Sequence, residues 1–146
     1  MIVSQSRSVG ANTVVQIITN TFATELTLSA SFQDTGLDAT ITPKYSNSKI
    51  LVQWCIQYQV SDSAANSHIH EHIFRDSTQL DPNSDGFRPI SSYNNGRSFH
   101  TTSWIDEPAT TSAVTYKIQA KEGTGDAGKA HENGNPSIMI LTEIRQ

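Results

Sequence analysis

The chain has 146 residues with 10 basic and 14 acidic side chains, a formal net charge of −4, and 36% hydrophobic residues. Its 18 Ser, 16 Thr and 9 Asn make it polar without making it highly charged, whereas disordered chains combine low hydrophobicity with a large net charge. One globular domain is therefore expected. The basic residues are scattered singly, which argues against a nucleic-acid partner, because nucleic acids bind clustered Lys and Arg.

Three further classes are excluded by simple patterns. No stretch approaches the roughly 18 apolar residues of a membrane span, so no membrane insertion is expected. The first seven residues lack the charged-then-apolar order of a signal peptide. The single Cys55 excludes an internal disulfide framework and a zinc site built from cysteines.

Alternation of apolar and polar residues is the recurring pattern along the chain, and it predicts strands rather than helices. Residues 1–12 are small and polar and predict a short N-terminal arm before a domain at 13–146. The clearest strand is 49–58, in which Ile50, Val52, Trp54 and Ile56 share one face. The other predicted strands are 13–19, 26–32, 38–43, 68–75, 87–92, 98–105, 114–121 and 137–144.

The last of these strands is apolar on both faces over its first half, so it is expected to lie centrally in a sheet or against another subunit. Turn signals separate the strands, among them DTG at 34–36, DPN at 81–83, NNG at 94–96 and NGNP at 133–136. Roughly nine short strands with regular turns predict an all-β fold. The expected architecture is a single jelly-roll-like antiparallel β-sandwich.

The most conspicuous group of reactive side chains is HIHEH at 68–72, which holds three of the five histidines. On a strand, His68, His70 and His72 share one face and Glu71 lies on the other. Alternate imidazoles can chelate Zn²⁺ or Ni²⁺, but the following positions do not supply the ligands of a cupin-type metal site. We therefore expect no bound metal and interpret this face as polar or subunit-facing, with a metal site as the alternative.

No catalytic residue and no cofactor are predicted. The Ser residues lack a Gly-x-Ser-x-Gly elbow, and Cys55, mid-strand opposite Trp54, is interpreted as a buried structural thiol. The acidic residues at 81, 85, 106 and 107 lie in predicted turns. The segment GTGDAGK at 123–129 lacks the ending of a phosphate-binding loop. These patterns favour a protein that is not an enzyme.

Aromatic side chains are a separate functional signal, because exposed rings stack on sugars. Trp104 shares its predicted strand face with His100 and Thr102, and Tyr93 lies beside the predicted turn at 94–96. Trp104 and Tyr93 are therefore the surface-recognition candidates, and a host surface glycan is the ligand they would suit.

Four stretches follow one another along the chain: FQDTGLDATITP at 32–43 followed by SNSKILV at 46–52, IFRDSTQL at 73–80, IDEPATTSAVTYK at 105–117, and NGN at 133–135 through SIMILTEI at 137–144. In this order they resemble a β-domain of tailed-bacteriophage structural proteins, especially from marine phages and cyanophages. In that family this domain is often the terminal domain of fibre-like or virion-surface proteins. The resemblance covers about residues 13–146 and implies a virion structural role and a homotrimer of sandwich protomers.

Two features depart from the family pattern. Its usual Arg-Asp-Gly-Thr turn is here Arg75-Asp76-Ser77-Thr78, so a positive φ at the lost glycine would be strained. The domain also begins close to Met1 with no long shaft before it. We therefore expect a capsid decoration (cement) protein, a short fibre head or a small adaptor rather than a long fibre.

These observations predict a non-enzymatic virion structural protein that contacts other copies of itself and other capsid or tail proteins. Loops 81–86, 92–97 and 123–134 are expected to be presented outward. Two alternatives stay open: a carbohydrate-binding receptor-recognition module of a tail fibre that uses Trp104 and Tyr93, and a metal-dependent β-sandwich enzyme that uses the histidine strand. Because only 36% of the residues are hydrophobic, part of the stabilising surface is expected to lie between subunits, and the isolated monomer is expected to be poorly stable.

Overall fold

The computed structural model describes residues 10–60, 67–92, 96–123 and 128–146. Most of these residues lie in strands, and the described chain has one short 3₁₀ helix, η1 (Glu132–Gly134). The strands are β1 (Thr13–Phe22), β2 (Leu26–Thr27), β3 (Gln33–Ile41), β4 (Lys49–Val60), β5 (Ser67–Arg75), β6 (Thr78–Gln79), β7 (Phe87–Ser92), β8 (Gly96–Asp106), β9 (Val114–Glu122), β10 (Gly128–Ala130) and β11 (Ser137–Arg145). The predicted all-β class is confirmed, and β6 and β10 are short strands that the pattern did not predict.

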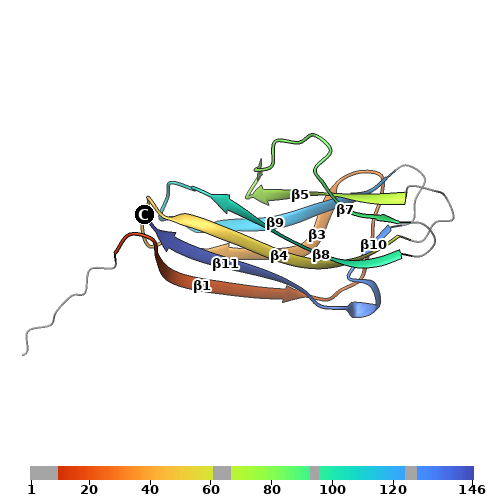
Figure 1. Ribbon diagram of the computed structural model, residues 1–146, viewed down its shortest axis with the longest axis horizontal. Coiled ribbons are helices and arrows are strands. Elements are labelled where there is room, and N and C mark those ends of the chain that lie inside the picture. The colour runs from red at the N-terminus through yellow and green to blue at the C-terminus, as the bar shows by residue number, and fades with distance from the viewer. Residues whose placement is uncertain (1–9, 61–66, 93–95, 124–127) are drawn as a thin grey trace, which may run out of the picture.

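The strands form two antiparallel sheets that pack face to face (Figure 1). Sheet A has the order β1-β11-β4-β8, with β10 and β2 beside the end of β4. Sheet B has the order β3-β9-β5, and both β6 and β7 pair with β5. Most successive long strands change sheet, which is the connection pattern of a jelly roll. The predicted jelly-roll sandwich is therefore present.

The hydrophobic core lies between the sheets and comes from the apolar halves of the alternating strands. Ile50, Val52, Trp54 and Ile56 of β4 are at most 1% exposed, as the period-two pattern predicted. β11 lies between β1 and β4, so the doubly apolar strand is central, as expected. Its inward residues include Met139, and its outward residues form part of a surface described below.

A buried carboxylate of sheet B accepts hydrogen bonds from sheet A inside the core. Glu71 of β5 is 0% exposed, and its Oε1 accepts a hydrogen bond from Trp54 Nε1 at 2.9 Å while its Oε2 accepts one from Tyr58 Oη at 2.7 Å. His100 Nδ1 lies 2.8 Å from Glu71 Oε1 but without the alignment of a hydrogen bond. Burial and the Glu71 charge raise the pKa of Tyr58 well above its ordinary value. These contacts tie sheet B to sheet A.

A second buried carboxylate, Glu143 of β11, holds the turn between β3 and β4. Its Oε1 accepts hydrogen bonds from Ser48 Oγ at 2.7 Å and from the backbone N–H groups of Lys44 and Tyr45, and its Oε2 accepts one from Gln16 Nε2. Burial by itself would raise the pKa of Glu143, but these donors outweigh it and lower the pKa below its ordinary value. The charged form is therefore the one that the turn requires.

The predicted turn at 34–36 is wrong, because this segment is a bulge inside β3. The pairing of β3 with β9 shifts between Asp34 and Asp38, and Gly36 has φ +86. A Cβ on Gly36 would lie 2.4 Å from the Phe22 ring, so only glycine fits this bulge. The strand expected at 26–32 shrinks to β2, and the strand expected from residue 38 begins at Gln33.

The hairpin between β5 and β6 contains Ser77 where the sequence pattern that it resembles has glycine, and a positive φ at Ser77 was expected to be strained. The positive φ falls on Asp76 (φ 53) and not on Ser77. Asp tolerates this conformation better than most residues, and Asp76 is held by its backbone N–H to Thr115 O at 2.7 Å and by its Oδ1, which accepts from Thr115 N at 2.9 Å. The turn therefore forms without a glycine.

The first described residues lie beside the last strand at one end of the sandwich, where Asn12 N donates to Arg145 O at 2.6 Å. Residues 1–9 of the predicted arm lie outside the described residues. Within the described part of the chain, no helix has the length and apolar character needed to cross a bilayer.

Candidate functional site

The broad uncharged surface of the molecule is the outer face of sheet A. Directly paired residues of neighbouring strands share a face, so the register of β1, β11, β4 and β8 identifies the side chains that point away from the core. By the same register Lys49 and Arg97 lie at the two ends of this outer face. Its central part consists of Val14, Ile17, Thr19 and Thr21 of β1, Ile138, Ile140, Thr142 and Ile144 of β11, Leu51, Gln53, Cys55 and Gln57 of β4, and Phe99, Thr101, Ser103 and Ile105 of β8. None of these side chains is charged.

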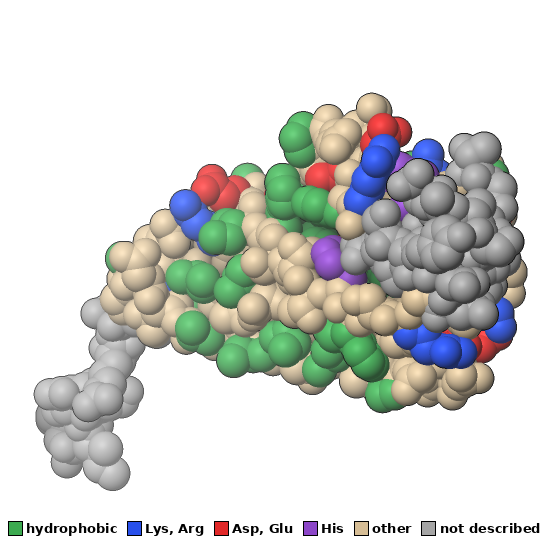
Figure 2. All heavy atoms as spheres, turned by 45° about the vertical axis from the view of Figure 1, so that its right-hand side comes forward, with side chains coloured by type: hydrophobic (Ala, Val, Ile, Leu, Met, Phe, Trp, Pro, Cys, Tyr) green, Lys and Arg blue, Asp and Glu red, His purple; other side chains and the backbone are tan. Residues whose placement is uncertain are grey.

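Large apolar side chains on this face are open to solvent. Ile17 and Phe99 are each 59% exposed, Ile105 is 58% exposed and Val14 is 52% exposed. They are the exposed large hydrophobic residues of the described chain. Figure 2 shows hydrophobic side chains among uncharged ones along the side of the molecule where β1 and β11 lie in Figure 1. Extended exposed apolar patches are typical of interaction surfaces.

Charged groups stand at the two ends of this face. At one end, Lys49 Nζ lies 3.0 Å from Glu107 Oε1. At the other end, Arg97 donates to the buried Glu132, with Nη2 2.7 Å from Oε1. The Arg97 guanidinium lowers the pKa of Glu132 below its ordinary value. The ion pairs thus frame an uncharged centre.

A shallow apolar hollow of about 120 Å³ lies on the outer face of sheet A. Gln53 and Cys55 of β4, Thr101 of β8, and Ile138 and Ile140 of β11 line it. The expectation that Cys55 is a buried thiol is therefore wrong for the single chain, because Cys55 is only half-buried here. A covering partner would complete its burial.

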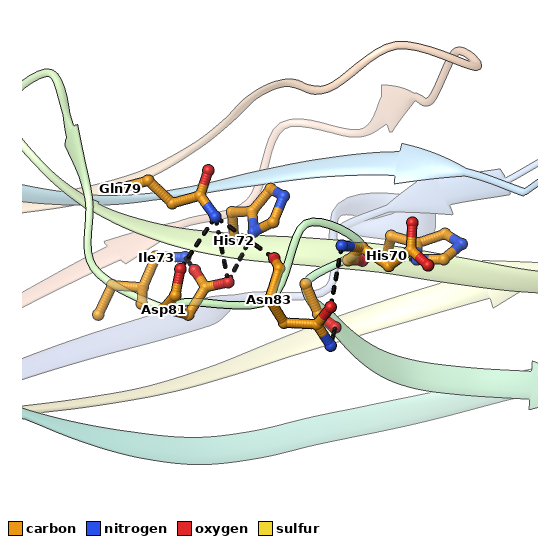
Figure 3. Close-up of polar contacts among 8 residues, drawn as sticks. His70, His72, Ile73, Gln79, Asp81 and Asn83 are labelled. Carbon is orange, nitrogen blue, oxygen red and sulfur yellow. Dashed lines mark hydrogen bonds and ion pairs between the residues drawn. The ribbon is translucent and has the colours of Figure 1, made fainter.

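The histidine strand alternates as predicted, with Ile69, Glu71 and Ile73 wholly buried on the inner side. His70 and His72 on the outer side are nevertheless only 5% and 3% exposed. The segment between β6 and β7 lies against both rings, since Asp81 contacts His72 and the Asp85 carbonyl contacts His70 (Figure 3).

His72 is committed to a structural contact. Its Nδ1 lies 2.8 Å from Asp81 Oδ2, and Asp81 Oδ1 accepts the backbone N–H of Ile73 at 3.1 Å. Gln79 Nε2 donates to the Asp81 carbonyl at 2.9 Å (Figure 3). Asp81 therefore holds the 80–86 segment against β5. His72 also packs on the Phe32 ring, with centroids 4.1 Å apart.

The three histidines do not converge. His68 and His70 are ring neighbours, with centroids 4.7 Å apart, whereas the His72 ring contacts Asp81. In the described ranges, no group of three or more His, Cys, Asp or Glu is placed to hold a metal ion. His131 contacts other residues: its Nδ1 lies 2.7 Å from Ser137 Oγ and its Nε2 lies 3.0 Å from the Thr35 carbonyl oxygen. Burial lowers the pKa of His131.

Of the two surface-recognition candidates, Trp104 lies among the described residues. Trp104 is directly paired with the inward Val52, packs partly against the core and meets the Phe87 ring at 6.4 Å. The face that it shares with His100 and Thr102 therefore turns inward rather than to solvent. Tyr93 lies outside the described residues. Sugar stacking by these two residues stays a prediction.

The predicted presentation loops are described in part: residues 82–85 are exposed, whereas several flanking residues are anchored to the sandwich. In 81–86, Asp81 is 3% exposed, and a Cβ on Gly86 would lie 2.1 Å from the Glu71 carbonyl. In 123–134, β10 pairs with β4 and β2, and His131 is wholly buried. Residues 93–95 and 124–127 of these loops lie outside the described residues.

Val14, Ile17 and Ile105, which are among the exposed residues of this face, were not singled out from the sequence. The available signal was the presence of Phe99 and Ile105 in the half of the 98–105 region that alternates opposite Trp104. A second signal was the pair Ile17 and Ile18, which is apolar on both faces of its strand. Both signals mark strands that are covered on two sides.

No protein-family model matches the chain, and no curated protein sequence matches it. Among solved structures, the chain is similar to one of the Gx strain of infectious bursal disease virus, at 13% identity with a TM-score of 0.42, over 88% of this chain and 36% of that one. It is also similar to the VP2 subviral particle of that virus, at 11% identity with a TM-score of 0.38, over 88% and 37% of the two chains. The chain spans little more than a third of those chains. Overlaps of this size establish neither a shared family nor a shared function.

Proposed function

We propose that the protein is a non-enzymatic structural component of a virion that assembles with copies of itself through the outer face of sheet A. The observation that carries this proposal is the uncharged face on which Ile17, Phe99 and Ile105 are each more than half exposed. Leaving such side chains in water forfeits the free energy that their burial would supply. An assembly partner recovers it.

The size of the face fits a protein interface. Four strands spaced about 4.8 Å apart and about 30 Å long give a projected area of roughly 600 Å², and the accessible area of a pleated surface is larger. A stable interface buries about 800 Å² on each partner. One face of sheet A is therefore of the right order for one interface.

The chemistry of the face favours a second copy of this chain as the occupant. Its centre carries no charge, so two copies can meet without like-charge repulsion and without desolvating an ion. Thr, Ser and Gln side chains among the apolar ones can exchange hydrogen bonds with neighbouring copies when three such faces surround a threefold axis. The ion pairs Lys49–Glu107 and Arg97–Glu132 stand at the ends, where interface rims are usually polar.

The virion role and the trimeric state are supported by the sequence resemblance to a tailed-phage β-domain. In this proposal the protein is a homotrimeric capsid decoration (cement) protein or a short fibre head, and it docks on capsid or tail proteins. Its localisation is the virion. Its action is mechanical, because the chain holds its neighbours together rather than transforming a substrate.

The assembly part is tested by Ile105→Lys, with Thr40→Lys as the control. Thr40 is exposed on β3 of the other sheet, so it receives the same charge away from the face. Losing the burial of Ile105 and placing an ammonium in the interface costs about 3 kcal/mol or more per contact, or roughly a hundredfold in dissociation constant. In sedimentation analysis, Ile105→Lys should be a monomer at concentrations where wild type and Thr40→Lys are trimers. A monomeric wild type, or an unaffected Ile105→Lys, would refute this interface.

The virion part is tested separately by immunogold labelling of intact particles in negative stain. Label over the whole capsid indicates decoration, and label at the tail indicates a fibre head or adaptor. Particles without label would contradict the virion role even if the protein self-assembles.

A further inference from the structure

A polar cavity of about 320 Å³ lies on the outer side of sheet B, away from the assembly face. Its polar lining comes from β5, β9, the start of β7 and the segment just before β7. The side chains concerned are those of His68, His70, Asp85, Arg88, Lys121 and Glu122. The volume is at the lower end of the range for small-molecule sites, so a ligand of about monosaccharide size fits.

The two cations of the cavity are weakly engaged by acids. Lys121 Nζ lies 4.6 Å from the centre of the Phe32 ring, and among the described residues no carboxylate lies within ion-pair distance of it. Arg88 Nη2 lies 3.9 Å from Asp85 Oδ2, and both side chains are 59% exposed. A contact this long between exposed groups is worth little. Both cations therefore keep donors available.

The acids of the cavity are directed elsewhere or are solvated. Glu122 Oε2 accepts the backbone N–H of Gly128 at 3.2 Å. The Asp85 carboxylate is largely in solvent, and the Asp85 backbone carbonyl is the part that faces His70. Neither acid therefore occupies the cations fully, because Asp85 makes only the long contact with Arg88 and Glu122 holds Gly128.

His70 is oriented so that one nitrogen remains for a ligand. Its Nδ1 lies 2.6 Å from the Asp85 carbonyl (Figure 3), so Nδ1 donates, and within the described chain Nε2 has no hydrogen-bond partner. Burial lowers the pKa of His70, and the charges of His68, Lys121 and Arg88 lower it further. Those charges act on the ring because they face it across the cavity.

We propose that this cavity binds a small polar ligand through an anionic group, a carboxylate or a phosphate, held by Lys121, Arg88 and His70. An anion placed there would relieve the mutual repulsion of the positive groups. A protonated His70 would then donate from Nε2 while Nδ1 stays on the Asp85 carbonyl. The site is independent of the proposed assembly face, which lies on the other sheet.

The test is a titration of the assembled, ¹³C/¹⁵N-histidine-labelled protein with D-glucuronate, inorganic phosphate and neutral D-glucose, followed by the histidine ring resonances. Saturable shifts of the His68 and His70 signals with an anion, and none with glucose, are expected. The tighter-binding anion identifies the source: glucuronate a carboxylated sugar, phosphate a phosphorylated ligand.

Lys121→Gln should weaken anion binding at least tenfold. Lys117→Gln is the matched control, because Lys117 lies on the same strand and face but pairs with Asp34 at 2.9 Å; it should leave binding unchanged. Equal shifts with glucose, no saturable shift with either anion, or an unchanged affinity in a folded Lys121→Gln/Arg88→Gln variant would overturn the proposal. None of these outcomes depends on whether the protein is found on a virion.

Discussion

The contact between the sheets at Glu71 makes a sharp prediction about stability. Glu71 and Tyr58 are wholly buried, and Trp54 is 1% exposed. Glu71→Ala removes the acceptor of both the Trp54 Nε1–H and the Tyr58 O–H, which bond it at 2.9 and 2.7 Å. Neither donor can reach water, so each becomes an unsatisfied buried group.

The expected loss follows from these two donors. A buried donor without a partner costs about 1–3 kcal/mol, and the missing side chain leaves a small cavity that adds to the cost. Glu71→Ala should therefore lower the free energy of unfolding by about 4 kcal/mol. Since domains are stable by about 5–15 kcal/mol, the variant should fold but unfold at a clearly lower denaturant concentration.

The assay is urea unfolding followed by Trp fluorescence at fixed protein concentration. Glu107→Ala is the control, because the Glu107 side chain is 67% exposed in its pair with Lys49 and should cost less than about 1 kcal/mol. A double-mutant cycle with Tyr58→Phe and Glu71→Gln should give a coupling of about 1 kcal/mol or more. If Glu71→Ala loses no more than Glu107→Ala, or the cycle shows no coupling, the cross-sheet role of Glu71 is refuted.

Two further predictions concern β11 and β4. The pKa of Glu143 in the folded protein lies below the ordinary 4.5, so its stabilising contribution is present above about pH 4.5 and is lost as the pH falls through the folded value. Glu143→Gln should therefore lose about 2 kcal/mol of unfolding free energy at pH 7. In thermal denaturation this deficit should shrink toward pH 3, and a pH-independent deficit would contradict the prediction. Cys55 lines the hollow on the assembly face, so maleimide should label it at least tenfold faster in Ile105→Lys than in wild type, and equal rates would count against coverage of that face.

The fold class follows from the sequence because alternation is a local property. The runs at 49–58 and 114–121 already specify which side chains face a core, and β4 and β9 place them there. The double apolarity of 137–144 likewise predicted a central strand, and β11 lies between β1 and β4.

Features made by close approach of distant segments were missed. DTG at 34–36 reads as a turn, yet Gly36 is required because the Phe22 ring occupies the space of a Cβ. Trp104 reads as an exposed aromatic, yet its face turns inward because β8 pairs with β4 in the register that sets it beside Val52. Neither contact has a local signal.

The histidine strand shows what the spacing of residues determines and what only the folded structure determines. The spacing of HIHEH by itself determined that His68, His70 and His72 share a face and that Glu71 opposes them. Only the tertiary structure decided that the 80–86 segment lies over this face, where Asp81 contacts His72. It also decided that His70 and Lys121 line the same cavity. Alternation depends on backbone geometry within one strand, whereas coverage depends on pairing between segments whose positions the chain reaches only when folded.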